Sequence, residues 1–387
     1  MRTPRPIEIV VALAAAAVVG IALGASRMRT KVPVAGVDSG LSTGIDASDS
    51  GRPDAEAAVD AFVGYTVDDD HQPEPPDPQV TDIEKLLEII PINDRSNEES
   101  LIVARRWLGA GANHTSQGNP SIATHAIART ECREKLRGVI LQTPLQRKIC
   151  GAPWEVPIHT GDPAKATTCI DAFEYPNRPC VLPFVYSHAI MARRLCALAG
   201  KRLCTQEEWN VACEADPNGG PPRKYAYGDT LDLKVCNTGR VKSPKCDVDT
   251  ALWKSCPTDT VPAGSYPQCR SRLGVFDQHG NVAEAMTRLE YGVNYVQLKG
   301  SAFFYDGEMY ADHCRFDPRW HVDPAEESWH TNYHLGFRCC RSVVPLADRG
   351  KPDASAPEVS VPGWNPTDAS EEAGDDAEEN PYEEDAD

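Results

Sequence analysis

The cysteines are the residues of this chain whose type and spacing could support chemistry. Three of them, Cys196, Cys204 and Cys213, lie within the segment CALAGKRLCTQEEWNVAC at positions 196–213. Thiols at this density can catalyse redox reactions, bind a soft metal ion or form disulfides. The whole chain has 14 cysteines, and all of them lie between Cys132 and Cys340.

Disulfides are the interpretation that this pattern favours. The number of cysteines is even, and they are confined to the part of the chain that reads as folded. A reducing cytosol rarely supports such a density unless the thiols hold metal, and no repeated C-x-x-C supplies the usual zinc spacing. The sequence therefore predicts a domain outside the cytoplasm, in a periplasm or at a cell surface, with up to seven disulfides.

Two other groups of residues offer an alternative chemistry. Cys339 and Cys340 are adjacent, and a disulfide between them could be redox active, although two separate long-range bridges are the favoured pairing. His330 and His334 are four residues apart, with His313 as a possible third metal ligand. These residues carry our second hypothesis, an oxidoreductase or a metal-dependent enzyme.

Short segments with many turns position the cysteines from about Cys150 onward, and only two helices are convincing there. The first is predicted to begin at Ser187 as a cap and to stop at Gly200. The second opens with a capping box, in which Thr205 caps the helix start and Glu208 reaches back. Each helix carries a cysteine near its end.

The rest of the chain divides by composition. Ile9–Ala25 is an uncharged apolar run after two arginines, which predicts an uncleaved signal anchor. A linker rich in Pro and acidic residues follows, and then a helical segment that is either an extension of the main domain or a separate spacer. The predicted parts are an anchor at 1–30, a disordered linker at 31–80, a helical extension at 81–149, the main domain at 150–345 and an acidic disordered tail at 346–387.

The charge of the chain excludes one class of partner. The formal net charge is -18, and residues 352–387 contain 13 acidic and no basic side chains. A nucleic-acid-binding protein needs a basic surface to contact phosphates. We therefore expect no nucleic-acid partner.

Four landmarks occur in order: RRLCALAGKRLCTQEEWNVACE, GVFDQHGNVAEAMT, LKGSAFF and HLGFRCC. In this order, over roughly 150–345, the chain resembles the formylglycine-generating enzyme family, also called sulfatase-modifying factor domains. The resemblance implies an irregular α+β fold of the C-type-lectin-like kind, stapled by disulfides. It also implies that Cys196 pairs with Cys339 and that Cys213 pairs with Cys314.

The resemblance fails at the catalytic positions. Active members of the family carry two copper-binding cysteines five residues apart, and in this chain those positions are Phe304 and Met309. The family's structural cysteine five residues further on coincides with Cys314. A phenyl ring and a lone thioether do not replace a thiolate pair at Cu(I). We therefore expect no copper, no formylglycine formation, and a non-catalytic binding or structural module that recognises a protein or glycan.

The resemblance also implies structural calcium. Asp277, Gly280, Val282 and Glu284, in VFDQHGNVAE, match positions around one family calcium. Carboxylates and backbone carbonyls from a tight loop are ligands that Ca²⁺ prefers. Asn237 matches a ligand of a second calcium, with a nearby carboxylate from Asp247 or Asp249.

Overall fold

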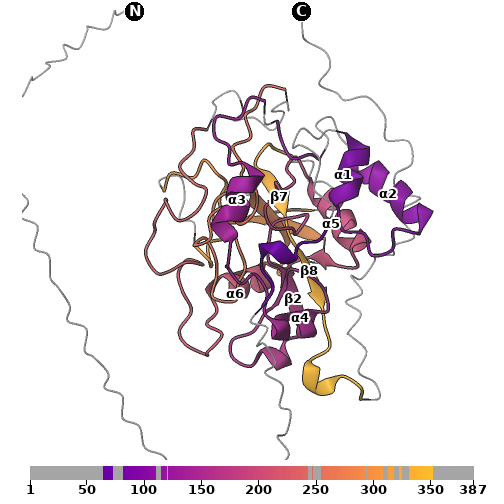
Figure 1. The fold of residues 1–387 in the computed structure, drawn as a ribbon, viewed down its shortest axis with the longest axis vertical. Helices are drawn as coiled ribbons and strands as arrows, with labels where there is room; N and C mark the ends of the chain where they lie inside the picture. The colour runs from indigo at the N-terminus through magenta and orange to yellow at the C-terminus, as the bar shows by residue number, and fades with distance from the viewer. Residues whose placement is uncertain are drawn as a thin grey trace, which may run out of the picture. The chain divides into compact units, whose positions relative to one another are not determined.

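Short strands and helices joined by long loops make up the described part of this computed structural model, all of it within residues 58–387 (Figure 1). The predicted anchor and the part of the predicted acidic tail from residue 352 onward fall outside the described residues, and so does Met309. The structure describes residues 64–72, 82–109, 115–119, 121–242, 246, 254–292, 294–307, 313–317, 322–324 and 331–351.

The two predicted helices of the main domain are present. α6 spans Gln206–Glu214, and its N-terminus carries the predicted capping box: Thr205 accepts from the Glu208 amide, and Glu208 accepts from the Thr205 amide. α5 spans Ala189–Leu198. The prediction that Ser187 caps α5 is wrong, because His188 is the N-cap residue and the buried Ser187 hydroxyl lies 3.4 Å from the hydroxyl of Thr115.

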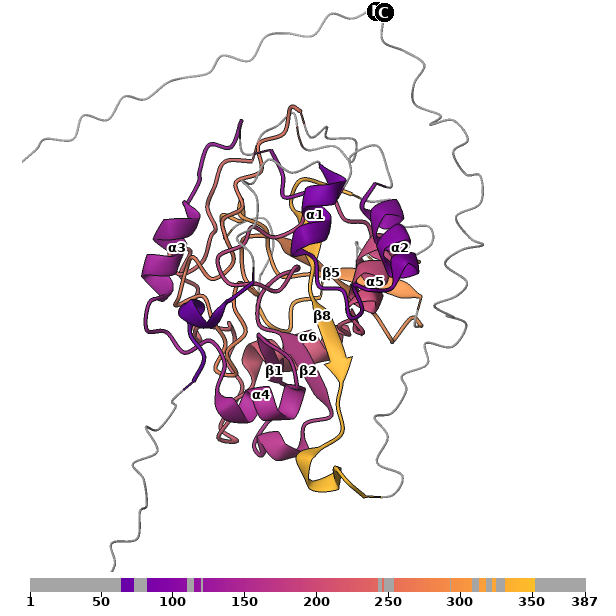
Figure 2. The same ribbon diagram turned by 45° about the vertical axis from the view of Figure 1, so that its right-hand side comes forward.

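The helices of the segment before residue 150 pack on the main domain. α1 (Ile83–Ile89) and α2 (Glu98–Leu108) lie beside α5 (Figures 1 and 2). Leu86 and Leu108 share one hydrophobic cluster with Leu195 and Phe337. The other helices in the described part of the chain are α3 (Arg129–Leu136), α4 (Pro144–Cys150) and three short 3-10 helices, Val67–Asp69, Pro163–Lys165 and Leu346–Asp348.

Two small sheets form the centre of the domain. The first has the order β1-β2-β8-β3, with all neighbours antiparallel. The second has the order β6-β5-β4-β7, in which β4 and β7 are parallel. The strands of the first sheet are β1 (Glu155–Pro157), β2 (Thr168–Asp171), β3 (Arg202–Leu203) and β8 (Cys339–Ser342). Those of the second are β4 (Ala283–Thr287), β5 (Tyr295–Lys299), β6 (Val322–Pro324) and β7 (Leu335–Phe337).

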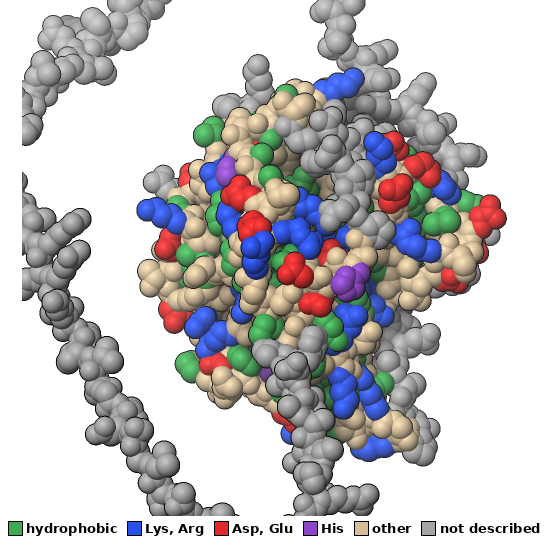
Figure 3. Space-filling view, in the orientation of Figure 1, with side chains coloured by type: hydrophobic (Ala, Val, Ile, Leu, Met, Phe, Trp, Pro, Cys, Tyr) green, Lys and Arg blue, Asp and Glu red, His purple; other side chains and the backbone are tan. Residues whose placement is uncertain are grey.

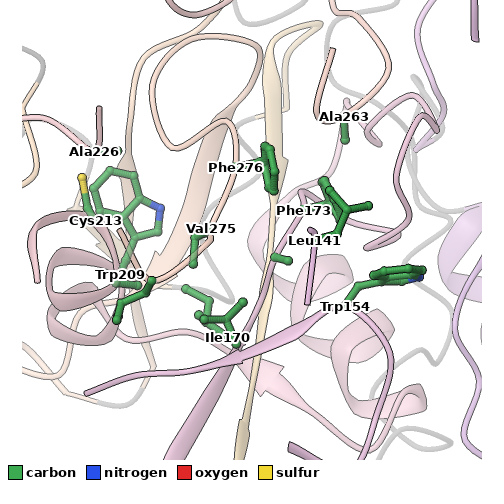
Figure 4. Packing of buried hydrophobic residues seen from close by; sticks show 14 of the residues in the cluster. Leu141, Trp154, Ile170, Phe173, Trp209, Cys213, Ala226, Ala263, Val275 and Phe276 are labelled. Carbon is green, nitrogen blue, oxygen red and sulfur yellow. The ribbon is translucent and has the colours of Figure 1, made fainter. Parts of the chain in front are cut away.

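One residue, Arg338, separates β7 from β8 and thus connects the two sheets. The hydrophobic core lies on both sides of this crossover. On one side, Trp209 of α6 and the stacked rings of Phe173 and Phe276, 4.9 Å apart, belong to the largest cluster (Figure 4). The result is the mixed helix and sheet fold that the sequence predicts, with short strands, long loops and disulfide staples.

The surface shows no segregation of charge on the face in Figure 3, where basic and acidic side chains are interspersed. Among the described residues, no helix is long and apolar enough to cross a membrane. The run Ile9–Ala25 stays a prediction, because it lies outside them.

Candidate functional site

Phe304, which the resemblance aligns with the first catalytic cysteine, is packed in an aromatic cluster. Its side chain is 5% exposed. The ring centroid lies 5.5 Å from that of Phe303, 6.2 Å from that of Tyr333 and 4.9 Å from that of His334. The Lys242 ammonium lies 5.1 Å from the Phe304 centroid. These groups offer no thiolate to a soft metal ion, so the residues here do not fit copper.

All fourteen cysteines are among the described residues, and none of them is free. Cys339 and Cys340 do not pair with each other, because each is joined to a different part of the chain. Cys196–Cys339 and Cys213–Cys314 are the two pairs that the resemblance implies. The other five bridges are Cys132–Cys180, Cys150–Cys169, Cys204–Cys340, Cys236–Cys269 and Cys246–Cys256.

Cysteines take part in two clusters with the spacing of a metal site. One consists of Cys213, Cys314 and His279, and the other of Cys150, Cys169 and Glu155. In both clusters the two cysteines form a disulfide with each other. Metal ions bind the thiolate, so the sulfurs are not ligands in this oxidised state.

A buried charge cluster surrounds the crossover between the sheets. Arg338 is fully buried, and its guanidinium forms a two-pronged ion pair with Glu284 of β4, with 2.6 Å between Nε and Oε2. The same guanidinium donates to the Asp171 carbonyl at 3.0 Å and to the Phe276 carbonyl at 2.9 Å. Glu284 also accepts from Trp209 Nε1 at 2.8 Å. Arg338 therefore ties both sheets and α6 together.

Two more buried carboxyl groups lie near Arg338. Glu174 accepts from Asn281 Nδ2 at 2.6 Å and from the Val282 amide at 3.1 Å. Asp277 adopts a positive φ of 56° and accepts from the Gly264 amide at 2.6 Å. Three carboxyl groups thus face one guanidinium, which leaves excess negative charge in a region removed from water if all of them ionise.

The pKa values of two of these carboxyl groups reflect the excess negative charge. Burial raises the pKa of Asp277 to about 7, against the opposing effects of the Gly264 hydrogen bond and Arg338. Burial also raises the pKa of Glu174 well above its usual range, and the charges of Asp277 and Glu284 add to the effect. A proton or a cation can relieve the excess charge, since buried charges need a partner.

The residues predicted to bind calcium lie in and beside this cluster. The charges of Asp277 and Glu284 interact within the cluster. Both carboxylate oxygens of Glu284 already accept hydrogen bonds from Arg338 or Trp209. The remaining carboxyl groups, those of Asp277 and Glu174, are hard oxygen donors of the kind that fits Ca²⁺. Val282 donates its amide to Glu174.

Asn237 was predicted to bind a second, separate calcium, but it lies against the loop at 277–284 that carries the first predicted site. Its carbonyl accepts from the Asn281 amide at 2.9 Å, and its Nδ2 donates to Asn281 Oδ1 at 3.0 Å. A Cβ on Gly280 would meet the Asn237 carbonyl oxygen at 2.3 Å, which explains a glycine there. Asp247 and Asp249 lie outside the described residues.

Glu174 and Arg338 are not among the residues predicted from the sequence. The available signal was a charged residue beside bulky apolar ones, in Phe173-Glu174-Tyr175 and in Phe337-Arg338. A charge in such a setting is buried only when it is paired or hydrogen-bonded.

The predicted histidine pair, His330 and His334, is only half described, because His330 lies outside the described residues. His334 lies in a turn directly before β7, and its ring packs on Phe304 and Tyr333. His313 packs edge-on against Phe316. His321 and His330 lie outside the described residues. Of the three histidines proposed as metal ligands, the structure therefore describes only His313 and His334.

Comparison with known proteins identifies relatives of this domain. Residues 168–343 match the family model of the sulfatase-modifying factor enzyme 1-like domain. A mouse protein, "Inactive C-alpha-formylglycine-generating enzyme 2", is 30% identical over 166 residues, which cover 42% of this chain and 50% of that protein. The match thus spans about half the length of this relative.

Two solved structures are also similar. The crystal structure of CarF is 18% identical, with a TM-score of 0.29, over 42% of this chain and 67% of CarF. PvdO from Pseudomonas aeruginosa is 17% identical, with a TM-score of 0.27, over 42% of this chain and 62% of PvdO. The matched segment contains β2 to β8, α5 and α6. Residues 168–343 of this chain are therefore similar to the sulfatase-modifying factor enzyme 1-like domain.

Proposed function

We propose that this protein is a non-catalytic binding or structural module that acts outside the cytoplasm. The observation that carries the proposal is the combination of Phe304, buried at the position of a catalytic thiol, with fourteen cysteines that are all engaged in disulfides. Oxygen activation by the family's chemistry needs a thiolate pair, and neither the position nor a free thiol supplies one. The name of the mouse relative, which calls that protein inactive, agrees with this proposal.

The disulfides also indicate the compartment. Seven bridges form and persist in an oxidising environment, which is typical of a periplasm, an endoplasmic lumen or a cell surface. We propose that Ile9–Ala25 anchors the domain to a membrane and that the acidic linker holds it away from that surface. The ligand is a protein or a glycan, and the acidic composition argues against nucleic acid.

We further propose a structural Ca²⁺ at Asp277, with Glu174, Glu284 and the loop around Gly280 and Val282 close to it. Support comes from the three buried carboxyl groups around a single arginine and from the raised pKa of Asp277. A divalent cation would replace the proton on these groups and neutralise the charge that Arg338 does not.

A peptide assay tests the absence of the family's activity. The protein is incubated with oxygen and a peptide containing Cys-x-Pro-x-Arg, with and without copper, and an active family member is run in parallel. We expect no mass change from cysteine to aldehyde with this protein and full conversion with the control. Aldehyde formation by this protein would overturn the proposal.

A thiol count separates the module from the alternative oxidoreductase. The native protein is denatured in the presence of a thiol-specific reagent, and bound metals are measured on the same sample. We expect no reactive thiol and no copper, iron or zinc. A reactive Cys339 or Cys340, or a bound transition metal, would favour the enzyme instead.

A further inference from the structure

Residues 64–72 lie within the segment that the sequence predicts as a linker, yet they pack on the domain next to α3 (Figures 1 and 2). We call this segment the strap. Its Val67 is 1% exposed and belongs to the largest hydrophobic cluster. The Tyr65 amide donates to the Gln142 carbonyl at 2.8 Å, and the Leu141 amide donates to the Tyr65 carbonyl at 2.8 Å. A buried apolar side chain and backbone hydrogen bonds thus hold the strap, as they hold a bound extended peptide.

A capping box shapes the strap locally. The Thr66 amide donates to the Asp69 carboxylate at 2.7 Å, and the Thr66 hydroxyl accepts from the Asp68 amide at 3.3 Å. These bonds join residues of the strap to each other, so they favour its turn without help from the domain. Asp69 is engaged within the strap, whereas Asp68 and Asp70 pair with arginines of the domain.

Three arginine side chains receive these two carboxylates. Arg178 Nη2 lies 3.0 Å from Asp70 Oδ2, and the two side chains are 2% and 1% exposed. Arg129 Nη2 lies 3.9 Å from the same oxygen. At the rim, Arg133 Nη2 lies 3.6 Å from Asp68 Oδ1. Clusters of arginines recognise acidic peptides by charge-assisted contacts of this kind.

The positions of the three arginines are fixed by a disulfide. Arg129 and Arg133 are four residues apart and therefore lie on the same face of α3. Cys132 of the same helix is joined to Cys180, which lies two residues after Arg178. We call the surface formed by the three arginines the arginine seat. Because its parts are cross-linked, little conformational freedom is lost when a carboxylate binds.

The arginine seat is crowded with like charges. Burial lowers the pKa of Arg129 to about 10, and the charge of Arg178 adds to this effect while that of Asp70 opposes it. The buried Nη1 of Arg133 has no hydrogen-bond partner among the described residues. Carboxylates stabilise such a cluster, because a nearby opposite charge favours the charged form of each arginine.

We propose that the arginine seat binds an acidic peptide segment of a partner protein, and that the strap occupies the seat as a competitor within the chain. The proposal rests on the proposed function as a binding module, and it specifies what the module recognises. The partner supplies a carboxylate for Arg178 and an apolar side chain in place of Val67. Since the strap is covalently joined to the domain, its effective concentration is on the order of millimolar, and the partner binds when the strap opens.

Hydrogen exchange of the natural protein measures whether the strap opens by itself. The Tyr65 amide reports on the strap, and the Phe276 amide, which donates to the Ala172 carbonyl at 2.8 Å, reports on the core. We expect the Tyr65 amide to exchange faster, through an opening that leaves the core folded. Equal protection of the two amides would show that the strap opens only when the whole domain unfolds, and the proposal would be wrong.

Two matched substitutions test the buried ion pair in the same measurement. Asp70→Asn removes the partner of Arg178 and should accelerate exchange of the Tyr65 amide about tenfold or more. Asp68→Asn is the control, because that side chain is 75% exposed, and it should accelerate exchange less than about fivefold. An equal effect of the two substitutions contradicts the role of Asp70 as the main contact.

Binding from outside the chain is tested with a synthetic peptide of residues 64–72, labelled for fluorescence anisotropy. In the full chain, Val67→Asp combined with Asp70→Asn places a charge where the strap needs an apolar side chain, which empties the seat. We expect this double variant, shown to be folded by its urea midpoint, to bind the peptide more tightly than Asp70→Asn does, and the natural protein to bind it least. A peptide that itself carries Asp70→Asn should bind the double variant about tenfold more weakly.

Three results would count against the proposal: no binding to the folded double variant, equal binding by all three proteins, or equal binding of the two peptides. If the double variant does not fold, the comparison of Asp70→Asn with the natural protein decides, and equal affinities of these two refute the proposal. None of these results affects the aldehyde assay or the thiol count, so failure here is distinguishable from failure of the proposed function.

Discussion

Replacement of Asp277 by asparagine tests how the buried charge cluster is neutralised. Asparagine resembles the protonated carboxyl group in shape, and its Oδ1 can still accept from the Gly264 amide. The native pKa of Asp277 is about 7, compared with an ordinary value of 3.8. A difference of this size corresponds to about 4 kcal/mol, an upper figure for one carboxyl group.

The sign of the pH effect follows from the direction of the shift. Below the ordinary pKa, both the native and the unfolded protein carry the proton, and stability from this group is fully present. As the pH rises toward 7, the unfolded chain releases the proton while the native protein retains it. The free energy of unfolding therefore decreases with pH over this range and the contribution is lost above it.

The assay is urea unfolding with the disulfides intact, at about pH 5 and about pH 8, in the presence of a chelator. We expect the natural protein to lose stability between the two conditions and Asp277→Asn to lose about 3 kcal/mol less, because only the part of the shift between pH 5 and the native pKa of about 7 is sampled. Added Ca²⁺ should restore the natural protein at the higher pH and have little effect on the variant. Asp232→Asn, at an exposed position, should leave the pH dependence unchanged.

Two outcomes would refute parts of this reasoning. Parallel pH profiles for the natural protein and Asp277→Asn would show that the carboxyl group does not hold its proton to neutral pH. A clear difference between the pH profiles without any effect of Ca²⁺ would support the protonated carboxyl group and contradict the proposed calcium site.

Two further predictions concern packing and cross-links. Phe304→Ala should lower the free energy of unfolding by about 3–5 kcal/mol in urea unfolding, because it leaves a void in the aromatic cluster. The control is Val241→Ala, at a position that is 79% exposed, which should have almost no effect in the same urea titration. If both variants match the natural protein, Phe304 is not a packed core residue. Replacement of Cys204 and Cys340 by alanine opens a bridge with a sequence separation of 136, but Cys196–Cys339 still joins the same two segments, so the loop that is released is about as short as that of Cys246–Cys256, whose separation is 10. Chain entropy therefore predicts a loss of about 3 kcal/mol for either pair, and a loss near 5 kcal/mol for Cys204 and Cys340 in urea unfolding would contradict that account.

Local signals in the sequence were sufficient to predict some of these structural features. Thr205 and Glu208 are three residues apart, and their capping box depends only on the backbone between them. The resemblance, and not a local signal, singled out Asp277 and Glu284, which interact electrostatically in the structure. In contrast, the cap expected at Ser187 was displaced by a contact with Thr115, which is 72 residues away.

The partners of the charge cluster could not be predicted from spacing. Glu284 and Arg338 are 54 residues apart, and Glu174 reaches Val282 across 108 residues. Asn237 and Gly280 were assigned to different sites, yet their backbones are in contact. Only the tertiary fold determines which buried carboxyl groups share an arginine, since a sequence pattern records the residue type and not its partner.

The adjacent cysteines of β8 have a consequence for how the protein matures. Successive side chains of a strand point to opposite faces, and Cys339 belongs to the hydrophobic cluster of α5 while Cys340 belongs to that of α6. Their partners, Cys196 and Cys204, are translated long before them. Each of these two bonds can close only after its β8 cysteine has been synthesised, so they form late, after bridges such as Cys132–Cys180 and Cys150–Cys169 can already have closed.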